Sequence, residues 1–205
     1  MARCLILTLL CAVWSLPVWA QGDPGGALSR PDRNSAGTPI NQDYFVKDQY
    51  PGTLWLVGIV EAHHLNERVI EDFRAGRYSS MIGDLEYTLD RIPNHPRALM
   101  LIGSVAELTN QPGLAIPRFE QAIQLYPHYA ITRAQYGFLL LRLGNPEDAV
   151  KELTRAVEID PEMAQAHAWL AEALGSSGRL EDGQEAAERA RQLGYTRTIP
   201  LPRPD

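Results

Sequence analysis

Cysteine and positive charge are both scarce in this sequence. Its two cysteines, Cys4 and Cys11, lie within the first twenty residues, so a chain that loses this segment has no disulfide, no cysteine-ligated zinc and no thiol nucleophile. Basic residues number 19 against 25 acidic ones, which gives a net charge of −6. Since no basic patch or arm stands out and phosphate backbones bind cationic surfaces, we do not expect nucleic acid as a partner.

Sequence motifs for catalysis are absent as well. The chain has no HExxH pair, no G-x-S-x-G turn and no glycine-rich phosphate loop. We therefore expect a protein that is not an enzyme and that binds neither metal nor cofactor. One cluster keeps an alternative open, because His64 and Glu67 stand three residues apart beside His63 and could share a metal on a helix. The alternative is a metal-dependent envelope enzyme or accessory factor using His63, His64 and Glu67.

The first twenty residues have the layout of a secretory signal peptide. Arg3 precedes an apolar run from Cys4 to Leu16, and small Val18 and Ala20 lie just before a cleavage position at Gln21. The run is shorter than the roughly 18 residues of a spanning helix. We predict a cleaved signal peptide over residues 1–20, export to a bacterial periplasm and no stable membrane insertion after cleavage, with retention as an anchor left open.

Composition divides the rest of the chain. Residues 21–40 are rich in Gly, Pro, Ser and Asp and predict a flexible leader. Residues 41–61 contain aromatics and an apolar run at 54–60, which periodicity assigns to neither strand nor helix, and we expect an N-terminal packing segment. Residues 198–205 form a proline-rich tail that either lies over the preceding structure or hangs free.

Between them, a period of 34 residues organises the chain. Pro93, Pro127 and Pro161 are spaced by one period each. Small residues recur on the same spacing, in the columns Gly103, Gly137 and Ala171, then Ala115, Ala149 and Gly183, then Ala122, Ala156 and Ala190. Antiparallel helices need small side chains where their axes approach closely, so each period predicts a helical hairpin that a proline ends.

These columns resemble the tetratricopeptide repeat family, a 34-residue helix–turn–helix. The resemblance implies an all-α, right-handed solenoid of about four hairpins, over residues 62–95, 96–129, 130–163 and 164–197, with the first one degenerate. Pro117 falls early in a second helix, which predicts an irregular turn near residues 111–116. His95 and His128 fall in the connections, where we expect surface histidines.

In this family the first helices of the hairpins line a groove for a peptide or partner helix. Mapped onto this chain, the resemblance implies these candidate groove residues: His63, Asn66, Phe73, Arg97, Met100, Ser104, Glu107, Ile131, Phe138, Gln165 and Glu172. The cations that clamp a terminal carboxylate in one subtype are missing. We expect a non-catalytic protein-interaction scaffold or adaptor of the cell envelope whose protein or peptide partner the sequence does not identify. Self-association is possible, with the groove filled by residues 41–61 or by another copy.

Overall fold

The computed structural model describes residue 33 and residues 39–201. The signal peptide predicted over residues 1–20 therefore lies outside the described residues, as does most of the predicted leader. Helices account for nearly all the regular structure in the described part, apart from one isolated bridge between Arg33 and Pro39. None of these helices combines the length and the apolarity that crossing a membrane requires.

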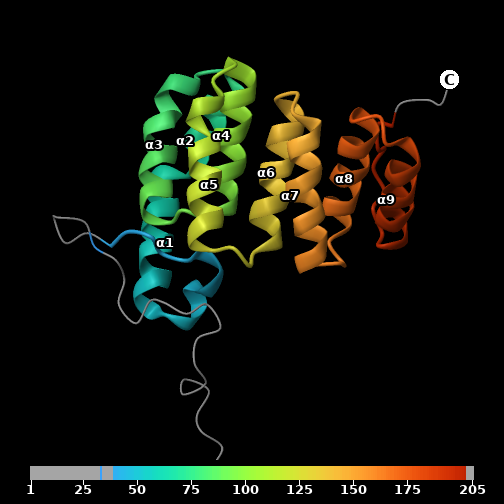
Figure 1. Cartoon of the computed structure of the whole chain (residues 1–205). Helices are drawn as coiled ribbons and strands as arrows, with labels where there is room; N and C mark the ends of the chain where they lie inside the picture. Colours follow the sequence, from blue (N-terminus) through green and yellow to red (C-terminus); the bar gives the residue numbers. More distant parts are fainter. Residues whose placement is uncertain (1–32, 34–38, 202–205) are drawn as a thin grey trace, which may run out of the picture. The chain divides into compact units, whose positions relative to one another are not determined.

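The helices follow one another as a stack of hairpins (Figure 1). Short 3-10 turns occur at η2 (Tyr44–Gln49) and η3 (Pro112–Leu114). The α-helices are α1 (Pro51–His64), α2 (Glu67–Arg74), α3 (Tyr78–Arg91), α4 (Pro96–Thr109), α5 (Ile116–Leu125), α6 (Ala130–Arg142), α7 (Pro146–Ile159), α8 (Ala164–Ser176) and α9 (Leu180–Gln192). The pairs α2–α3, α4–α5, α6–α7 and α8–α9 form four hairpins, which confirms the predicted all-α solenoid.

Prolines mark the boundaries of these hairpins. Pro93, Pro127 and Pro161 stand in the connections between one hairpin and the next, as their spacing predicted. Pro117 lies in the first turn of α5, where its missing N–H costs no hydrogen bond. The residues before it form the 3-10 turn η3, which confirms the expected irregularity and leaves α5 only ten residues long.

The turn inside each hairpin uses a left-handed residue. These residues are Gly76, Asn110, Gly144 and Gly178, with φ angles of 71°, 53°, 79° and 81°, and they recur every 34 residues. In each turn the next N–H bonds back to a carbonyl of the first helix, as Asn145 N does to Leu140 O at 2.9 Å. Glycine adopts this conformation without strain, and asparagine is among the few other residues that tolerate it.

Small residues allow the two helices of a hairpin to approach. A Cβ atom added at Gly137 of α6 would lie 2.5 Å from Leu153 Cγ and 3.1 Å from the Ala149 carbonyl oxygen of α7. Gly103 is looser, because the same added atom would meet Phe119 at 3.6 Å. Leu85, Phe119 and Leu153, one period apart, are buried in the continuous core that these contacts enclose.

The N-terminal segment packs on the hairpin formed by α2 and α3. The run at residues 54–60 is helical, and Leu56, Val57 and Val60 of α1 form a separate small apolar cluster with Ile92. Upstream, Gln42 N donates to the Arg91 carbonyl at 2.7 Å. The segment thus covers the end of α3, with which α1 is in contact.

The first hairpin departs from the predicted boundaries. Its first helix was expected to begin at residue 62, but residues 62–64 are the end of α1, and α2 begins only at Glu67. Asn66 explains the break, because its side-chain amide donates to the Ala62 and His63 carbonyls at 3.2 Å each and so ends α1. His63 and Asn66 are therefore not on a first helix.

His95 is a second correction, since it was expected at the surface and is 1% exposed. Its Nδ1 accepts from Ala98 N at 3.3 Å, so the imidazole caps α4. Its Nε2 lies 3.1 Å from Glu61 Oε1 of α1, and the Tyr44 ring covers it at 4.6 Å. The N-terminal segment, which lies outside the repeat pattern, buries this side chain.

The chain beyond α9 turns back over the last hairpin. Ile199 and Leu201 pack against the core, and Leu201 Cδ2 would lie 3.4 Å from a Cβ atom at Gly183. Up to residue 201, the proline-rich tail therefore lies over the preceding structure rather than hanging free. Residues 202–205 lie outside the described part.

Candidate functional site

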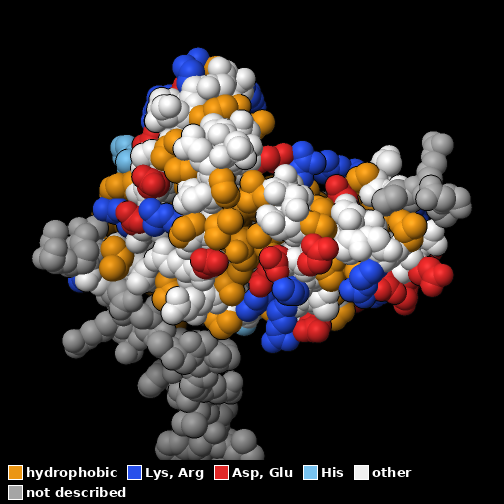
Figure 2. All heavy atoms as spheres, turned by 45° about the horizontal axis from the view of Figure 1, so that its top comes forward, with side chains coloured by type: hydrophobic (Ala, Val, Ile, Leu, Met, Phe, Trp, Pro, Cys, Tyr) orange, Lys and Arg blue, Asp and Glu red, His pale blue; other side chains and the backbone are white. Residues whose placement is uncertain are grey.

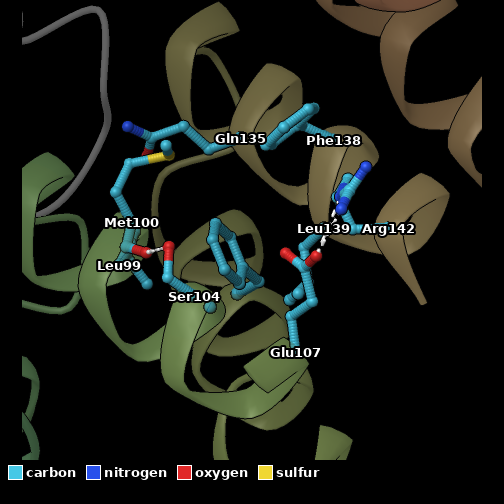
Figure 3. Close-up of a pocket in the computed structure, with 10 residues that line it drawn as sticks. Leu99, Met100, Ser104, Glu107, Gln135, Phe138, Leu139 and Arg142 are labelled. Carbon is cyan, nitrogen blue, oxygen red and sulfur yellow. Dashed lines mark hydrogen bonds and ion pairs between the residues drawn. The ribbon is translucent and has the colours of Figure 1, made fainter. Parts of the chain in front are cut away.

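The first helices of the last three hairpins share one side of the array. α4 contacts α6, and α6 contacts α8. On each of these helices, residues three or four positions apart lie on the same side. We call this side the first-helix face. Figure 3 shows its centre, where Met100, Ser104 and Glu107 of α4 lie opposite Phe138 and Arg142 of α6.

A small recess lies between α4 and α6 on this face. Its volume is about 20 Å³, and Phe119 and Leu139 line it together with the residues named above. A space of this size holds about one water molecule, whereas pockets for small molecules measure roughly 300–1,000 Å³. The face therefore suits contact along its length with a chain or a helix rather than enclosure of a small ligand.

An ion pair closes one end of the recess. Arg142 donates through Nη2 and Nε to Glu107 Oε1, at 2.7 and 2.9 Å, and so links the second hairpin to the third. The hydrogen bond and charge of Glu107 raise the pKa of Arg142 above its usual value. The Ser104 hydroxyl donates to the Met100 carbonyl at 2.9 Å and is thereby occupied within its own helix.

Aromatic side chains continue the face onto α8. The rings of Phe138 and Trp169 stack with centroids 4.6 Å apart and an interplanar angle of 22°. Glu172, one turn beyond Trp169, is half-buried, and this burial raises the pKa of its carboxyl group although Arg142 opposes the shift. Met100 and Phe138 line the same recess and Phe138 stacks on Trp169, so these three side chains, which we call the apolar strip, mark α4, α6 and α8 in turn, with Glu107, Arg142 and Glu172 nearby.

Gln135 has an acceptor buried in the wall of the recess. Its side chain is 6% exposed, and its Nε2 donates to the Pro96 carbonyl at 3.2 Å, which fixes the orientation of the amide. The Oε1 atom then has no hydrogen-bond partner among the described protein atoms. Figure 3 places the flexible Met100 side chain beside this amide.

Charge on the molecular surface is mixed. On the face in Figure 2, acidic and basic side chains lie next to one another, and hydrophobic side chains reach the surface in the middle of the array. Several of the ion pairs lie within one helix, such as Lys151 with Asp148 and Arg155 with Glu158. Such exposed pairs contribute little to stability.

The structure brings part of the predicted groove together. Met100, Ser104, Glu107 and Phe138 line the recess. Arg97, Ile131 and Gln165 lie in the first turns of α4, α6 and α8, and Phe73 instead packs against Tyr78 in the first hairpin, with ring centroids 5.9 Å apart.

Among the polar and aromatic residues of the first-helix face, Gln135, Arg142 and Trp169 were not among the predicted groove residues. Arg142 could have been found from charge, since Glu107 precedes it by 35 residues, which is one period plus one position. Helices that pack side by side place such positions together. Gln135 and Trp169 are themselves one period apart, and Gln135 precedes Phe138 by one helical turn.

His64 and Glu67, which were considered as ligands of one metal ion, have different partners in the structure. His64 Nδ1 lies 2.7 Å from Asp84 Oδ1, and Arg68 holds the other oxygen of that carboxylate. Glu67 instead pairs with Arg74 at 3.4 Å. In the part of the chain that the structure describes, no three His, Cys, Asp or Glu side chains are grouped as a metal ion would need.

Comparison with known proteins adds to this picture. The family model described as tetratricopeptide repeat matches residues 108–158 and 140–194. Small glutamine-rich tetratricopeptide repeat-containing protein 2 of Mycosarcoma maydis is 29% identical over 87 residues, which are 42% of this chain and 25% of that protein. Protein STIP1 homolog of Dictyostelium discoideum is 29% identical over 94 residues, which are 46% of this chain and 17% of that one.

The matched region thus spans a quarter or less of the length of those relatives. Among solved structures, the crystal structure of MamA protein superimposes with a TM-score of 0.50 at 16% identity, over 69% of this chain and 78% of that one. At this identity the likeness concerns the fold alone.

Proposed function

This chain belongs to the tetratricopeptide repeat family, and we propose that it is a non-catalytic adaptor that binds a peptide segment or a partner helix on its first-helix face. The observation that carries the proposal is the apolar strip of Met100, Phe138 and Trp169, which runs across three helices beside the Glu107–Arg142 ion pair. Aromatic side chains at the centre of a face, with charged groups at its edge, are the usual source of binding energy between proteins.

The dimensions of the recess favour one extended contact with a polypeptide. Its volume of about 20 Å³ accepts at most a small group, so Met100 and the two stacked rings must supply most of the contact area. The buried Gln135 Oε1 supplies an acceptor for a main-chain or side-chain N–H of the partner once Met100 moves aside. The partner would then present apolar side chains with at least one donor between them.

The location we propose is the cell envelope, after export to a bacterial periplasm. The proposal is based on the layout of residues 1–20, with Arg3 before an apolar run and small residues before Gln21. Mass spectrometry of the protein isolated from its host tests it. A mature chain beginning at Gln21 in the periplasmic fraction is the expected result, and a full-length chain in the cytosol would contradict it.

Site-specific photocrosslinking in the native host is the first test of the binding face. A photoreactive residue at Phe138 is expected to give a discrete adduct, which mass spectrometry identifies. The matched control is the same residue at Glu188 of α9, whose side chain is 62% exposed and lies outside the first-helix face. Adducts of equal yield from both positions, or from Glu188 alone, would refute binding on this face.

Binding measurements with the identified partner then test the strip itself. Truncation of a central aromatic anchor typically costs 2 kcal/mol or more, so Phe138→Ala and Trp169→Ala are each expected to weaken binding by about 30-fold or more. Glu188→Ala is expected to change the Kd by less than about twofold. Circular dichroism of each variant checks that the array remains folded.

A further inference from the structure

The exposed side of α1 is unusual for a helix in contact with water. The exposed positions from Pro51 to Ala62 are all apolar or glycine, and polar groups reach the surface of α1 only in its last turn, as at His63 and at Glu61, whose side chain is 40% exposed. Trp55 is 67% exposed, Leu54 46% and Ile59 38%. A surface helix normally presents polar side chains outward, and one that is apolar on all sides is normally buried. We call Pro51, Leu54, Trp55, Gly58, Ile59 and Ala62 the α1 apolar face.

We propose that the α1 apolar face binds the same face of a second copy of this chain, with the two α1 helices antiparallel. The six positions are placed symmetrically about the midpoint of Leu56 and Val57. An antiparallel pair related by a two-fold axis therefore sets Trp55 opposite Gly58, Leu54 opposite Ile59 and Pro51 opposite Ala62. This inference concerns a surface separate from the first-helix face and does not depend on the function proposed for that face.

The sizes of the paired residues are complementary. The largest side chain, Trp55, meets the smallest position, Gly58, where an added Cβ atom would touch nothing within 4 Å. Side chains on a helix lean towards its N-terminus, so each Trp55 indole lies over the hollow between Gly58 and Ala62 of the other copy. A glycine between bulky neighbours is unfavourable on an exposed helix but allows two helices to approach closely.

The area of the face fits a reversible dimer. Contact through the α1 apolar face would bury about 400 Å² of each copy, or about 800 Å² in total, which is below the roughly 1,200 Å² of stable interfaces. We therefore expect a weak, reversible dimer rather than a permanent one. The α1 apolar face itself carries no charged side chain, so the net charge of −6 places no like charges directly at the contact between the two copies.

Charge near α1 favours a second copy over a lipid surface. Helices that lie on membranes pair their apolar side with several Lys or Arg side chains. Here Asp43 and Asp48 precede α1 and Glu61 lies in its last turn, with Lys47 as the nearby cation in the segment leading into the helix. The acidic surroundings would oppose contact with anionic headgroups.

Sedimentation velocity over about 1–200 µM protein is the first test, with the full chain carrying Cys4→Ser and Cys11→Ser as the reference. The reference is expected to shift from monomer to dimer with increasing concentration. Leu54→Glu and Trp55→Glu are each expected to weaken the dimer at least tenfold. The matched control is Leu108→Glu on α4, because Leu108 is also an exposed leucine, at 58%, but lies away from α1.

A reference protein that stays monomeric, or a dimer that survives both α1 variants, would overturn the proposal. Equal loss with Leu108→Glu would do the same. Vesicles of phosphatidylglycerol provide the lipid arm: a monomer that floats with vesicles through Trp55 would assign the face to a membrane instead.

Cross-linking tests the antiparallel register separately. Mixing Leu54→Cys with Ile59→Cys protein is expected to give a mixed disulfide in preference to either homodimer, because an antiparallel pair sets these two positions opposite each other. Replacing the Ile59→Cys partner with Leu108→Cys is expected to abolish the product. Preferential Leu54–Leu54 cross-links would contradict the antiparallel arrangement.

Discussion

Gly137 and Gly103 occupy the same position in consecutive repeats, yet alanine is expected to affect them in opposite directions. Both lie inside helices, where replacing glycine with alanine normally gains about 0.5–1 kcal/mol. At Gly103 the new methyl group meets Phe119 at 3.6 Å and Leu139 at 3.7 Å, which are ordinary contacts. Gly103→Ala should therefore raise the free energy of unfolding by about 0.5–1 kcal/mol.

The same change at Gly137 meets a rigid obstacle. The methyl carbon would lie 2.5 Å from Leu153 Cγ, which is a branch point rather than a flexible end, and 3.1 Å from the Ala149 carbonyl oxygen. Overpacking of this kind costs about 1–3 kcal/mol, and two obstacles favour the upper value. After subtraction of the gain in helix propensity, Gly137→Ala is expected to lower the free energy of unfolding by about 2 kcal/mol, which lowers the Tm by about 4–8 °C.

Thermal and urea unfolding followed by far-UV circular dichroism measure both variants. Urea is needed because repeat arrays can unfold in stages, so the m-value must be compared with that of the unmodified protein. The double variant Gly137→Ala with Leu153→Ala is the internal control, since removing the Leu153 branch should abolish most of the additional cost. A Gly137→Ala protein at least as stable as the unmodified one would refute the close approach of α6 and α7.

Three further predictions concern stability. Asn110→Ala should lower the free energy of unfolding by about 1–2 kcal/mol and Asn110→Gly should not, because Asn110 has a φ of 53°; urea unfolding of both variants checks this. Burial lowers the pKa of His95 although Glu61 opposes the shift. The unfolded chain then takes up the proton first, so stability should fall as the pH drops below about 6.5, and His95→Gln should flatten a plot of Tm against pH in that range. Arg142→Met removes a surface ion pair and should cost less than about 1 kcal/mol in urea unfolding, and a larger loss would mean that the Glu107 contact couples the hairpins strongly.

The repeat pattern was sufficient to predict most of the fold. Prolines and small residues act locally, by ending a helix or by allowing close approach, so their 34-residue spacing predicted the hairpins and the irregular turn before Pro117. The predicted start of the first hairpin was wrong because the Asn66 side chain can bond either to the helix before it or to the helix after it, and the repeat spacing does not decide between the two. The prediction that His95 lies at the surface was wrong for a related reason, since Tyr44, a side chain from outside the repeats, covers it.

The candidate site was predictable only in outline. Family positions located Met100 and Phe138, because these depend on the register of the helix alone. The acceptor of Gln135 and the stacking of Trp169 depend on how neighbouring hairpins are rotated against each other, which is a tertiary property. The apolar run at residues 54–60 showed that something must be buried there, but only the structure shows which side of α1 is left exposed.

The left-handed residues at 34-residue intervals bear on how such a protein can change in length over generations. Gly76, Asn110, Gly144 and Gly178 each reverse the chain at the same phase of the repeat. Duplication or loss of a whole period therefore leaves every remaining turn in phase with its helices, and each new junction repeats an existing one. Inserting one residue within a helix instead rotates all later side chains of that helix by about 100° and moves its buried side out of the core. Gene-level changes are thus tolerated in units of one hairpin, so the array can be lengthened without redesigning the part already present.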